Sequence, residues 1–288
     1  MKGIVLAGGA GTRLHPLTQV LSKQLLPVYD KPMIYYPISL LMLADIREIL
    51  IISTPHDLPQ FQSLLGDGSR FGIRLSYEVQ PKPEGLPQAF IIGERFLAGE
   101  ASTLILGDNI FYGQNLPELL RQHRDSLIGG VIYATKVAHP ERYGVVEFDA
   151  ARKPLSLEEK PSVPKSPYAV TGVYMFAADA PEEAKKLTPG RRGELEILGL
   201  ADRYLERNAL SLELLGRGTA WFDTGTHQSL LDAANFIATI QDRQGLYVAC
   251  LEEIAYEKRW IDGAALCQAA DASGKSSYGD YLRRLAYG

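Results

Sequence analysis

Three glycines and two cations near the start of the chain could bind a phosphate group. In the sequence LAGGAGTRLHPLT, Gly8, Gly9 and Gly11 directly follow an apolar run, and Arg13 comes two residues later. Because glycine has no side chain, the main chain here can approach phosphate oxygens and adopt positive φ angles. A second cation, Lys23, follows in the segment VLSKQLLPV. The segment therefore indicates an anion site, and the rest of the sequence must indicate which anion.

Two common phosphate-binding motifs do not fit this segment. A Walker A loop needs glycine, lysine and a hydroxyl residue in succession, whereas Gly11 is followed by Thr12 and Arg13. A dinucleotide-binding fingerprint that starts at Gly9 meets Leu14 where a third glycine would let helix and strand pack closely. A nicotinamide-dependent dehydrogenase is therefore disfavoured. A tight turn without a ligand also fits a short glycine cluster, and this alternative stays open.

The composition is that of an ordinary folded protein. The 288 residues include 46% hydrophobic and 22% charged residues, and the formal net charge is −4. That balance gives no overall attraction to nucleic acid or to an anionic membrane, so any positive field must be local. The two cysteines, Cys250 and Cys267, exclude a disulfide framework and predict buried, reduced thiols. No apolar run reaches the roughly 18 residues of a membrane span, and we expect a cytoplasmic protein.

Short apolar segments alternate with helical patterns through the first half of the chain. Segments rich in β-branched residues predict strands at 3–7, 48–53, 73–79, 102–108 and 130–137. Apolar residues at helical spacing predict helices at 33–44, 58–66, 86–97 and 116–126. This alternation predicts an α/β fold with a Rossmann-like, mixed but mainly parallel sheet flanked by helices. Ligands bind beyond the carboxyl ends of such strands, where Gly8 and Asp108 are both expected.

The second half of the chain has a different pattern. It predicts further strands at 144–149, 154–161, 168–177 and 210–215, some of them antiparallel, and a helix at 194–207. After Asp223 the pattern is almost wholly helical, with helices at 226–245 and 252–260 and two short ones beyond. We therefore expect an α/β core at 1–225 and a C-terminal helical segment, 226–288, packed on it.

Motifs along nearly the whole chain resemble those of the sugar-phosphate nucleotidyltransferases. LAGGAGTRLHPLT is followed, in the expected order, by SKQLLPV, KPMIYYP, LILGDNIFYG, ERYGVVEFD, SLEEKP, YAVTGVY, RGELEI and WFDTGTHQSL. The sequence is most similar to members that transfer a deoxythymidylyl group from dTTP to glucose 1-phosphate, giving dTDP-glucose for dTDP-rhamnose synthesis, and pyrophosphate. The resemblance implies direct, Mg²⁺-assisted attack of the sugar phosphate on the α-phosphorus. The same chemistry with UTP or another sugar 1-phosphate stays open, as does a non-catalytic regulatory subunit.

The resemblance implies a catalytic set of four charged residues. Arg13 and Lys23 match the cations that bind the triphosphate, and Asp108 and Asp223 match the ligands of Mg²⁺. The chemistry is suitable, because two phosphorylated substrates repel each other and the leaving pyrophosphate gains charge. Taken alone, Lys23 would be read as a solvated surface lysine and each aspartate as a turn residue. Their separation along the chain does not pair the aspartates; the resemblance does.

The nucleotide and the sugar phosphate are each assigned further residues by the resemblance, in regions of about 1–142 and 143–225. Gln80 and Gly85 match positions that contact thymine, and a glutamine amide can both donate to and accept from a pyrimidine edge. The nucleotide set is Leu6, Gly8, Gly9, Gly11, Thr12, Arg13, Lys23, Gln80, Gly85 and Asp108. The sugar-phosphate set is Tyr143, Gly144, Glu159, Lys160, Val170, Thr171 and Glu194.

Two further segments bear on specificity and regulation. Leu198, Gly199 and Ala201 replace the threonine, aspartate and asparagine that are usual after the RGELEI motif, which puts the sugar preference in question. The C-terminal segment resembles the part of the family that forms a second nucleotide site between subunits of a homotetramer, which implies inhibition by dTDP-rhamnose. The residues implied there are Tyr112, Gly113, Glu253 and Ile254. A helical cap without a ligand is the alternative.

Overall fold

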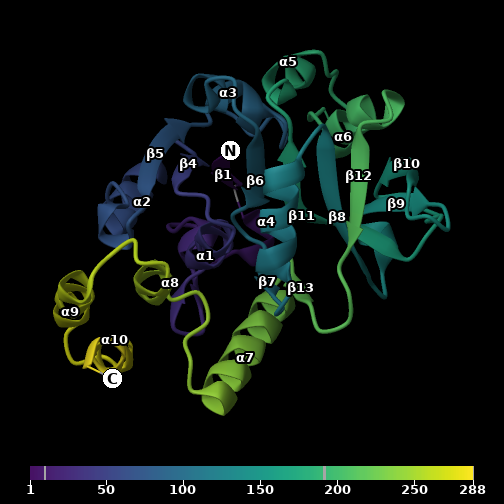
Figure 1. Ribbon diagram of the computed structural model, residues 1–288. Coiled ribbons are helices and arrows are strands. Elements are labelled where there is room, and N and C mark those ends of the chain that lie inside the picture. The colour runs from purple at the N-terminus through teal and green to yellow at the C-terminus, as the bar shows by residue number, and fades with distance from the viewer. Residues whose placement is uncertain (10, 191–192, 288) are drawn as a thin grey trace.

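A nine-stranded sheet forms the centre of the computed structural model, which describes residues 1–9, 11–190 and 193–287 (Figure 1). Seven strands follow one another across it in the order β12-β8-β11-β6-β1-β4-β5, and β9 and β10 extend from β11 as a hairpin. The strands are β1 (Lys2–Ala7), β4 (Glu48–Ser53), β5 (Arg74–Val79), β6 (Ser102–Leu106), β8 (Gly130–Lys136), β9 (Gly144–Phe148), β10 (Pro154–Glu159), β11 (Tyr168–Phe176) and β12 (Leu210–Leu214).

The sheet is mixed, as predicted, but parallel pairings do not predominate: the described strands of this sheet form four parallel and four antiparallel pairings. β1 pairs in parallel with β4 and β6, β4 with β5, and β8 with β12. β11 runs antiparallel to both of its neighbours in the row, β6 and β8. In this row, β11 is the reversed strand and separates the parallel group β6-β1-β4-β5 from the parallel pair β8-β12. The carboxyl ends of β1 and β6 therefore lie at the same edge of the sheet as residues of β11 and β9.

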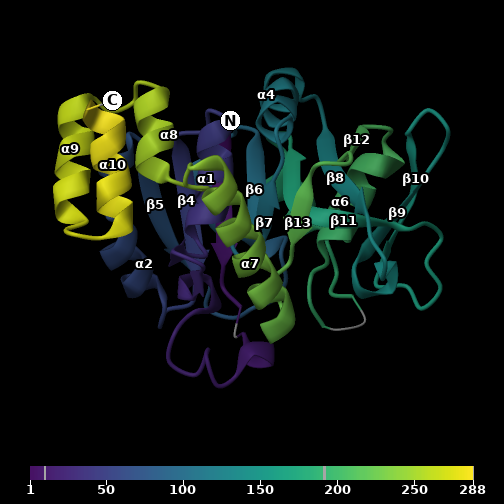
Figure 2. The ribbon, with the colours of Figure 1, turned by 90° about the horizontal axis from the view of Figure 1, so that it is seen from below.

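Helices cover both faces of the sheet (Figures 1 and 2). One face packs against α1 (Tyr35–Leu43), α2 (Leu58–Leu65), α4 (Leu116–Ser126) and α8 (Leu251–Glu257). The other packs against α3 (Gln88–Leu97), α5 (Ala180–Lys185) and α6 (Ile197–Glu206). Neighbouring residues of a strand point to opposite faces, so Ile4 and Val5 are both fully buried, in different clusters. Burial on both faces explains the continuous apolar runs in the sequence.

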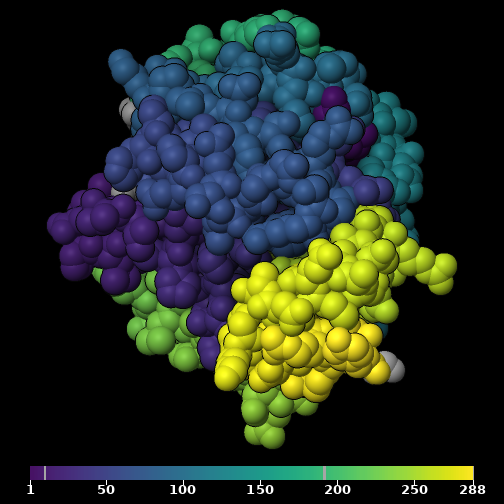
Figure 3. Space-filling view, turned by 90° about the vertical axis from the view of Figure 1, so that its left-hand side faces the viewer, coloured from purple at the N-terminus to yellow at the C-terminus, as the bar shows by residue number. Residues whose placement is uncertain are grey.

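The C-terminal helices pack against the N-terminal half of the chain. They are α7 (His227–Gln244), α8, α9 (Gly263–Ala272) and α10 (Ser277–Tyr287). A capping box between Thr226 and Ser229 starts α7, whose apolar side contacts Val28 and Met33. Figure 3 shows α8, α9 and α10 (yellow) against the surface of the first part of the chain (purple and blue). No helix among the described residues combines the length and the apolar character that crossing a membrane requires.

Several short elements were not predicted. These are α5, the ribbon of β2 (Pro27–Val28) and β3 (Lys31–Pro32), the ribbon of β7 (Ile110–Tyr112) and β13 (Ala220–Phe222), and four 3₁₀ helices: η1 (Thr12–Leu14), η2 (Lys23–Leu25), η3 (Ser69–Phe71) and η4 (Pro140–Arg142). Both cysteines are free, but Cys267 is partly exposed, so the prediction of two buried thiols is wrong for that residue.

Candidate active site

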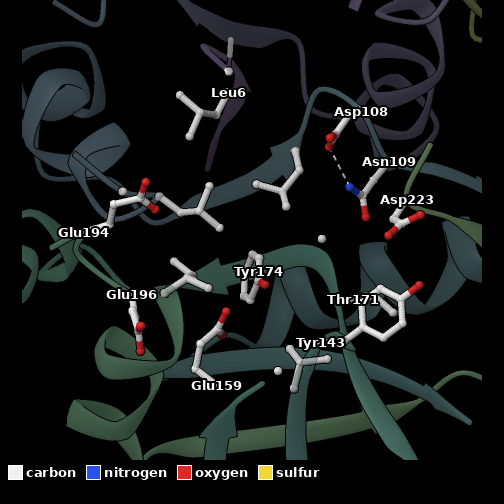
Figure 4. A pocket seen from close by; sticks show the side chains of 18 of the residues that line it. Leu6, Asp108, Asn109, Tyr143, Glu159, Thr171, Tyr174, Glu194, Glu196 and Asp223 are labelled. Carbon is white, nitrogen blue, oxygen red and sulfur yellow. Dashed lines mark hydrogen bonds between the residues drawn. The ribbon is translucent and has the colours of Figure 1, made fainter. Parts of the chain in front are cut away.

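A cavity of about 540 Å³ lies beyond the carboxyl ends of β1 and β6, where the alternating pattern placed the ligand. Most of the predicted site residues line it (Figure 4): Leu6, Gly8, Gly9, Arg13, Gln80, Gly85, Asp108, Tyr143, Gly144, Glu159, Lys160, Val170, Thr171, Glu194 and Asp223. Gly11, Thr12 and Lys23 are not part of the lining, although Lys23 contacts the lining residue Asp108. Ala10 of the glycine segment and Arg192 of the RGELEI motif lie outside the described residues.

The glycine loop provides main chain without side chains at one wall of the cavity. A Cβ on Gly8 would lie 2.1 Å from Oε1 of Gln80, so the close approach of these residues requires glycine. Gly11 has φ of +60° and precedes η1, and its carbonyl accepts a hydrogen bond of 2.7 Å from Thr18 Oγ1. The space beside Gly9 is open to 4 Å. The loop can therefore bring backbone N–H groups close to an anion.

Lys23 is buried next to the cavity rather than solvated. Lys23 is only 6% exposed. Its Nζ lies 2.5 Å from Oδ2 of Asp108 and 3.5 Å from the backbone oxygen of Asp223. Arg13 is exposed at the mouth, and its guanidinium lies against the backbone of Gly225. At this end, Lys23 is fixed behind the lining by its ion pair with Asp108, whereas Arg13 lines the cavity and is open to an incoming anion.

The small ribbon of β7 and β13 brings the two aspartates together. Ile110 pairs with Phe222, so Asp108 and Asp223 lie near the same end of the ribbon. Thr224 Oγ1 donates to the backbone oxygen of Asp108 at 2.7 Å, which ties the two loops directly. This pairing joins residues more than a hundred positions apart, which no spacing in the sequence indicates.

A buried asparagine holds the Asp108 carboxylate in place. Asn109, 3% exposed, donates from Nδ2 to Asp108 Oδ1 at 2.9 Å and accepts at Oδ1 from Trp221 Nε1 at 2.6 Å. A Cβ on Gly172 would lie 2.4 Å from Asn109 Oδ1, so glycine is needed on β11 to admit this amide. The polar chain from Trp221 to Asp108 holds the carboxylate in one orientation, and Figure 4 shows its bond between Asn109 and Asp108.

The donor set at this edge fits a hard divalent cation. Two carboxylates, from Asp108 and Asp223, lie at one side of the cavity, and such an ion takes a few carboxylates with water or phosphate oxygens as its other ligands (Figure 4). The described residues contain no cluster of three or more histidine, cysteine, aspartate or glutamate side chains with metal-binding geometry. A metal held by these two carboxylates would take its remaining ligands from water or from a bound phosphate compound.

Gln80 and Gly85 form a second wall, beside the glycine loop. Gln80 is 4% exposed and follows β5, and its backbone N–H donates to the oxygen of Ser53 at 2.8 Å. Gly85 has φ of +113° and pairs with Leu195, whose backbone oxygen would lie 2.0 Å from a Cβ at position 85. Any larger residue at position 85 would push the backbone at Gly85 away from the backbone at Leu195.

The opposite end of the cavity is lined by β9, β10 and β11. Glu159 ends β10, and the Lys160 ammonium lies 3.8 Å from its Oε1, with the lysine side chain 47% exposed. Thr171 donates from Oγ1 to the backbone oxygen of Tyr133 at 2.9 Å, so its hydroxyl proton is used within the protein. Carboxylates and a cation at this end suit a ligand that carries both hydroxyls and a phosphate.

Tyr143 links this end to the aspartates. Its ring lies 5.1 Å from that of Trp221. Burial, together with the negative charge of Asp223, raises the pKa of the Tyr143 hydroxyl. The hydroxyl therefore stays protonated near neutral pH and can donate to a ligand oxygen.

The unusual residues after the RGELEI motif lie within α6. Leu198 and Ala201 are buried in the face of α6 that packs on the sheet. Leu198 Cδ1 would lie 2.7 Å from a Cβ on Gly144, so this leucine fills the space beside a lining residue. Gly199 is partly exposed, and a Cβ there would lie 3.7 Å from Leu187 Cδ2, an ordinary van der Waals contact. The replacement therefore adds apolar packing beneath the sugar end of the cavity.

Sequence reasoning missed several lining residues. Ser22 Oγ donates to Oε1 of Gln24 at 2.9 Å, which fixes the Gln24 amide with its nitrogen available to the cavity. The others include Asn109, Arg142, Tyr174, Glu196 and Trp221. Gln24, Asn109 and Arg142 are each adjacent in sequence to a predicted residue, and Trp221 is two positions from Asp223. All four lie inside motifs already singled out, and this proximity in sequence was the signal available.

The four residues predicted for a regulatory site fall in two places within the chain. Tyr112 donates to Gln244 Oε1 at 2.9 Å on α7, and Gly113 lies against Thr219. Glu253, on α8, accepts from Tyr281 of α10 at 2.5 Å, and Ile254 is buried in the core cluster beneath the sheet. The site remains a prediction that depends on an assembly of several subunits.

Comparison with known proteins finds relatives that are nucleotidyltransferases. A model of the family described as nucleotidyl transferase matches residues 2–240. The chain is 56% identical over 285 residues to a glucose-1-phosphate thymidylyltransferase of Neisseria meningitidis, and 54% identical to one of Mycobacterium tuberculosis, each with 99% of both chains covered.

Solved structures agree with the fold. A Bacillus anthracis protein assigned as a glucose-1-phosphate thymidylyltransferase, solved with sucrose, has a TM-score of 0.76 and 40% identity, covering 82% of this chain and 94% of its own. A UDP-glucose pyrophosphorylase in complex with UDP-glucose has a TM-score of 0.73 at 23% identity, with 83% of this chain and 98% of its own covered. The latter likeness concerns the fold alone.

Proposed function

Because this chain belongs to the nucleotidyl transferase family, we propose that it transfers a deoxythymidylyl group from dTTP to α-D-glucose 1-phosphate, giving dTDP-glucose and pyrophosphate. The observation that supports this most strongly is the single cavity with two different ends. A glycine loop, Arg13 and two aspartates suit a triphosphate at one end. Glu159, Lys160 and further polar groups suit a sugar phosphate at the other.

The reaction needs positioning and charge stabilisation more than proton transfer. A phosphate oxygen of glucose 1-phosphate attacks the α-phosphorus, a new P–O bond forms, and the bond to the β-phosphate oxygen breaks with its electron pair leaving on pyrophosphate. The nucleophile is already an anion, so no base is required. The glycine loop and Arg13 would hold the triphosphate, and Lys160 the sugar phosphate. Tyr143, held protonated, can donate to a phosphate oxygen.

Members of this family generally use a divalent metal ion, and we infer that Mg²⁺ serves here. Asp108 and Asp223 would hold it, since both carboxylates lie at the triphosphate end of the cavity. When bound, such an ion neutralises charge on the phosphate oxygens. Asn109 and Trp221 contribute by keeping the Asp108 carboxylate oriented.

We also propose which region binds each substrate and how the subunits assemble. Residues 1–142 would bind the nucleotide and 143–225 the sugar phosphate, with 226–288 as a helical segment packed on the core. In a homotetramer, Tyr112 and Gly113 of one subunit would lie near α8 of another and form a second nucleotide site with it. Binding of dTDP-rhamnose at that site would inhibit the enzyme. Sedimentation analysis tests the tetramer. Saturable dTDP-rhamnose binding that persists with the active site blocked tests the second site, and its absence removes that proposal.

Pyrophosphate release tests the proposed function. Wild-type protein is assayed with glucose 1-phosphate, Mg²⁺ and either dTTP or UTP, beside Asp223→Asn and a sample treated with chelator. Fast release with dTTP that is lost in the variant and restored to the chelated sample by Mg²⁺ is the expected result. A preference for UTP would keep the mechanism and change the base. No release with any nucleotide, from folded protein, would indicate a non-catalytic regulatory protein.

A further inference from the structure

A short chain of hydrogen bonds outside the cavity fixes the amide of Gln80. Gln80 Nε2 donates to Gln88 Oε1 at 2.7 Å. Gln88 Nε2 in turn donates to Glu84 Oε2 at 2.8 Å, and the backbone N–H of Glu84 donates to Gln88 Oε1 at 3.3 Å. Gln88 is the first residue of α3 and does not line the cavity, so it can act on a ligand only through Gln80.

The direction of this chain is set by groups that cannot exchange roles. A backbone N–H can only donate, and an ionised carboxylate can only accept. Glu84 supplies both, so the Gln88 amide fits in one orientation, with its oxygen toward Gln80. Glu84 is itself held, because its backbone oxygen accepts from Leu195 at 2.8 Å beside the tight contact of Gly85. Gln80 must therefore turn its nitrogen toward Gln88.

The outcome is that Gln80 presents an acceptor at the glycine wall of the cavity. Its Oε1 lies where a Cβ on Gly8 would come within 2.1 Å, and both residues line the cavity. Thymine and uracil carry an N–H donor at ring position 3, whereas cytosine carries an acceptor there. An acceptor from Gln80 pairs with the first two bases and repels the third.

We propose that Gln88 and Glu84 are positioning residues that lock Gln80 as a hydrogen-bond acceptor and so make the site select thymine or uracil over cytosine. The inference rests on the proposed function in one respect, that Gln80 contacts the base. It adds what selects against cytosine, and it assigns that selection to two residues that touch no ligand.

The test compares nucleotide preference in Gln88→Leu and Glu84→Ala with that of wild type. Gln62→Leu is the matched control, because Gln62 is an exposed glutamine on α2, away from the cavity. Steady-state kcat/KM is measured for dTTP and dCTP with glucose 1-phosphate, and the dissociation constants of both nucleotides are measured by calorimetry without the sugar phosphate. Melting temperatures show that each variant is folded.

We expect the ratio of kcat/KM for dTTP to that for dCTP to fall by on the order of tenfold in Gln88→Leu, since the unlocked Gln80 amide can turn to donate to cytosine and is no longer held with its acceptor toward thymine. Glu84→Ala should lower the ratio by about threefold, because the backbone N–H still holds Gln88. The control should keep the wild-type ratio. A merely structural role for Gln88 would lower activity with both nucleotides equally.

An unchanged ratio in both folded variants overturns the inference, as does a wild-type protein that binds dCTP as well as dTTP. Failure of the proposed function gives a different result, namely no pyrophosphate release by wild type. In that case the ratio of the dissociation constants of dCTP and dTTP, measured by calorimetry, still decides whether Gln88 sets the base preference. The exposed position of Glu84 keeps the second variant folded if Gln88→Leu is not.

Discussion

Removing the charge of either cavity aspartate should strongly lower activity, but only one of the two changes should also lower the stability of the fold. Asp108 accepts from Lys23 Nζ at 2.5 Å, whereas the contact from Lys23 to Asp223 goes to a backbone oxygen at 3.5 Å. Asp108→Asn therefore leaves a buried ammonium without its carboxylate. Asp223→Asn leaves the backbone contact unchanged.

The expected loss of stability in Asp108→Asn follows from how deeply Lys23 and Asp108 are buried. Removing one partner of a fully buried ion pair costs about 3–5 kcal/mol. Lys23 is 6% exposed, but the Asp108 side chain is 27% exposed, so water can partly replace it. We therefore expect Asp108→Asn to lower the free energy of unfolding by about 2 kcal/mol. At about 2.1 cal/mol/K per residue, this lowers the melting temperature of the 288-residue chain by about 3 °C.

Thermal unfolding and pyrophosphate release are measured on the same preparations. Both single variants should lose on the order of 10²- to 10³-fold in rate, and Asp223→Asn should melt within about 1 °C of wild type. The double variant Lys23→Met/Asp108→Asn has no unpaired buried charge and should recover most of the lost stability. Equal melting temperatures for the two single variants would refute the structural distinction between the aspartates.

Three further changes test other parts of the structure. Gly8→Ala should displace Gln80 and raise KM for the nucleotide by about tenfold, without changing KM for the sugar phosphate; equal effects on both would contradict this. Thr224→Val removes the hydrogen bond to the Asp108 backbone oxygen and should cost about 1–3 kcal/mol in chemical denaturation. Burial raises the pKa of Asp202 from 3.8 to about 6, so folding stability falls as pH rises through that interval. Asp202→Asn should therefore raise the melting temperature near pH 7 and have no such effect near pH 3, and a pH-independent difference would count against it.

The strands and helices could be predicted because most are long and strongly patterned. Every segment expected as a strand or helix in the first half is present, and the four strands expected later are β9 to β12. The missed elements have two to six residues. β7 and β13 contain three each, too few to show a period of two, and they are stabilised by pairing with each other rather than by their own sequences.

The site was harder to predict where it depends on long-range contacts. The aspartates could be named by resemblance, but their proximity comes from the ribbon and from Thr224, which no local pattern reveals. Lys23 would be expected in solvent from its residue type, and its burial depends on the ion pair with Asp108. Gln88 gave no signal at all, because its effect depends on the orientation of an amide.

The pairing of β7 with β13 also bears on when the enzyme becomes active during its synthesis. The strands that carry the glycine loop and Asp108 lie within the first 112 residues, whereas Asp223 follows a strand that begins at residue 220. A nascent chain can build the nucleotide end of the sheet early, since its contacts are comparatively local. It cannot complete the pair of carboxylates until β13 has left the ribosome and docked. On the proposed role of Asp223, the half-made protein would carry the glycine loop without the second carboxylate, and catalysis would begin only when nearly the whole chain has been made.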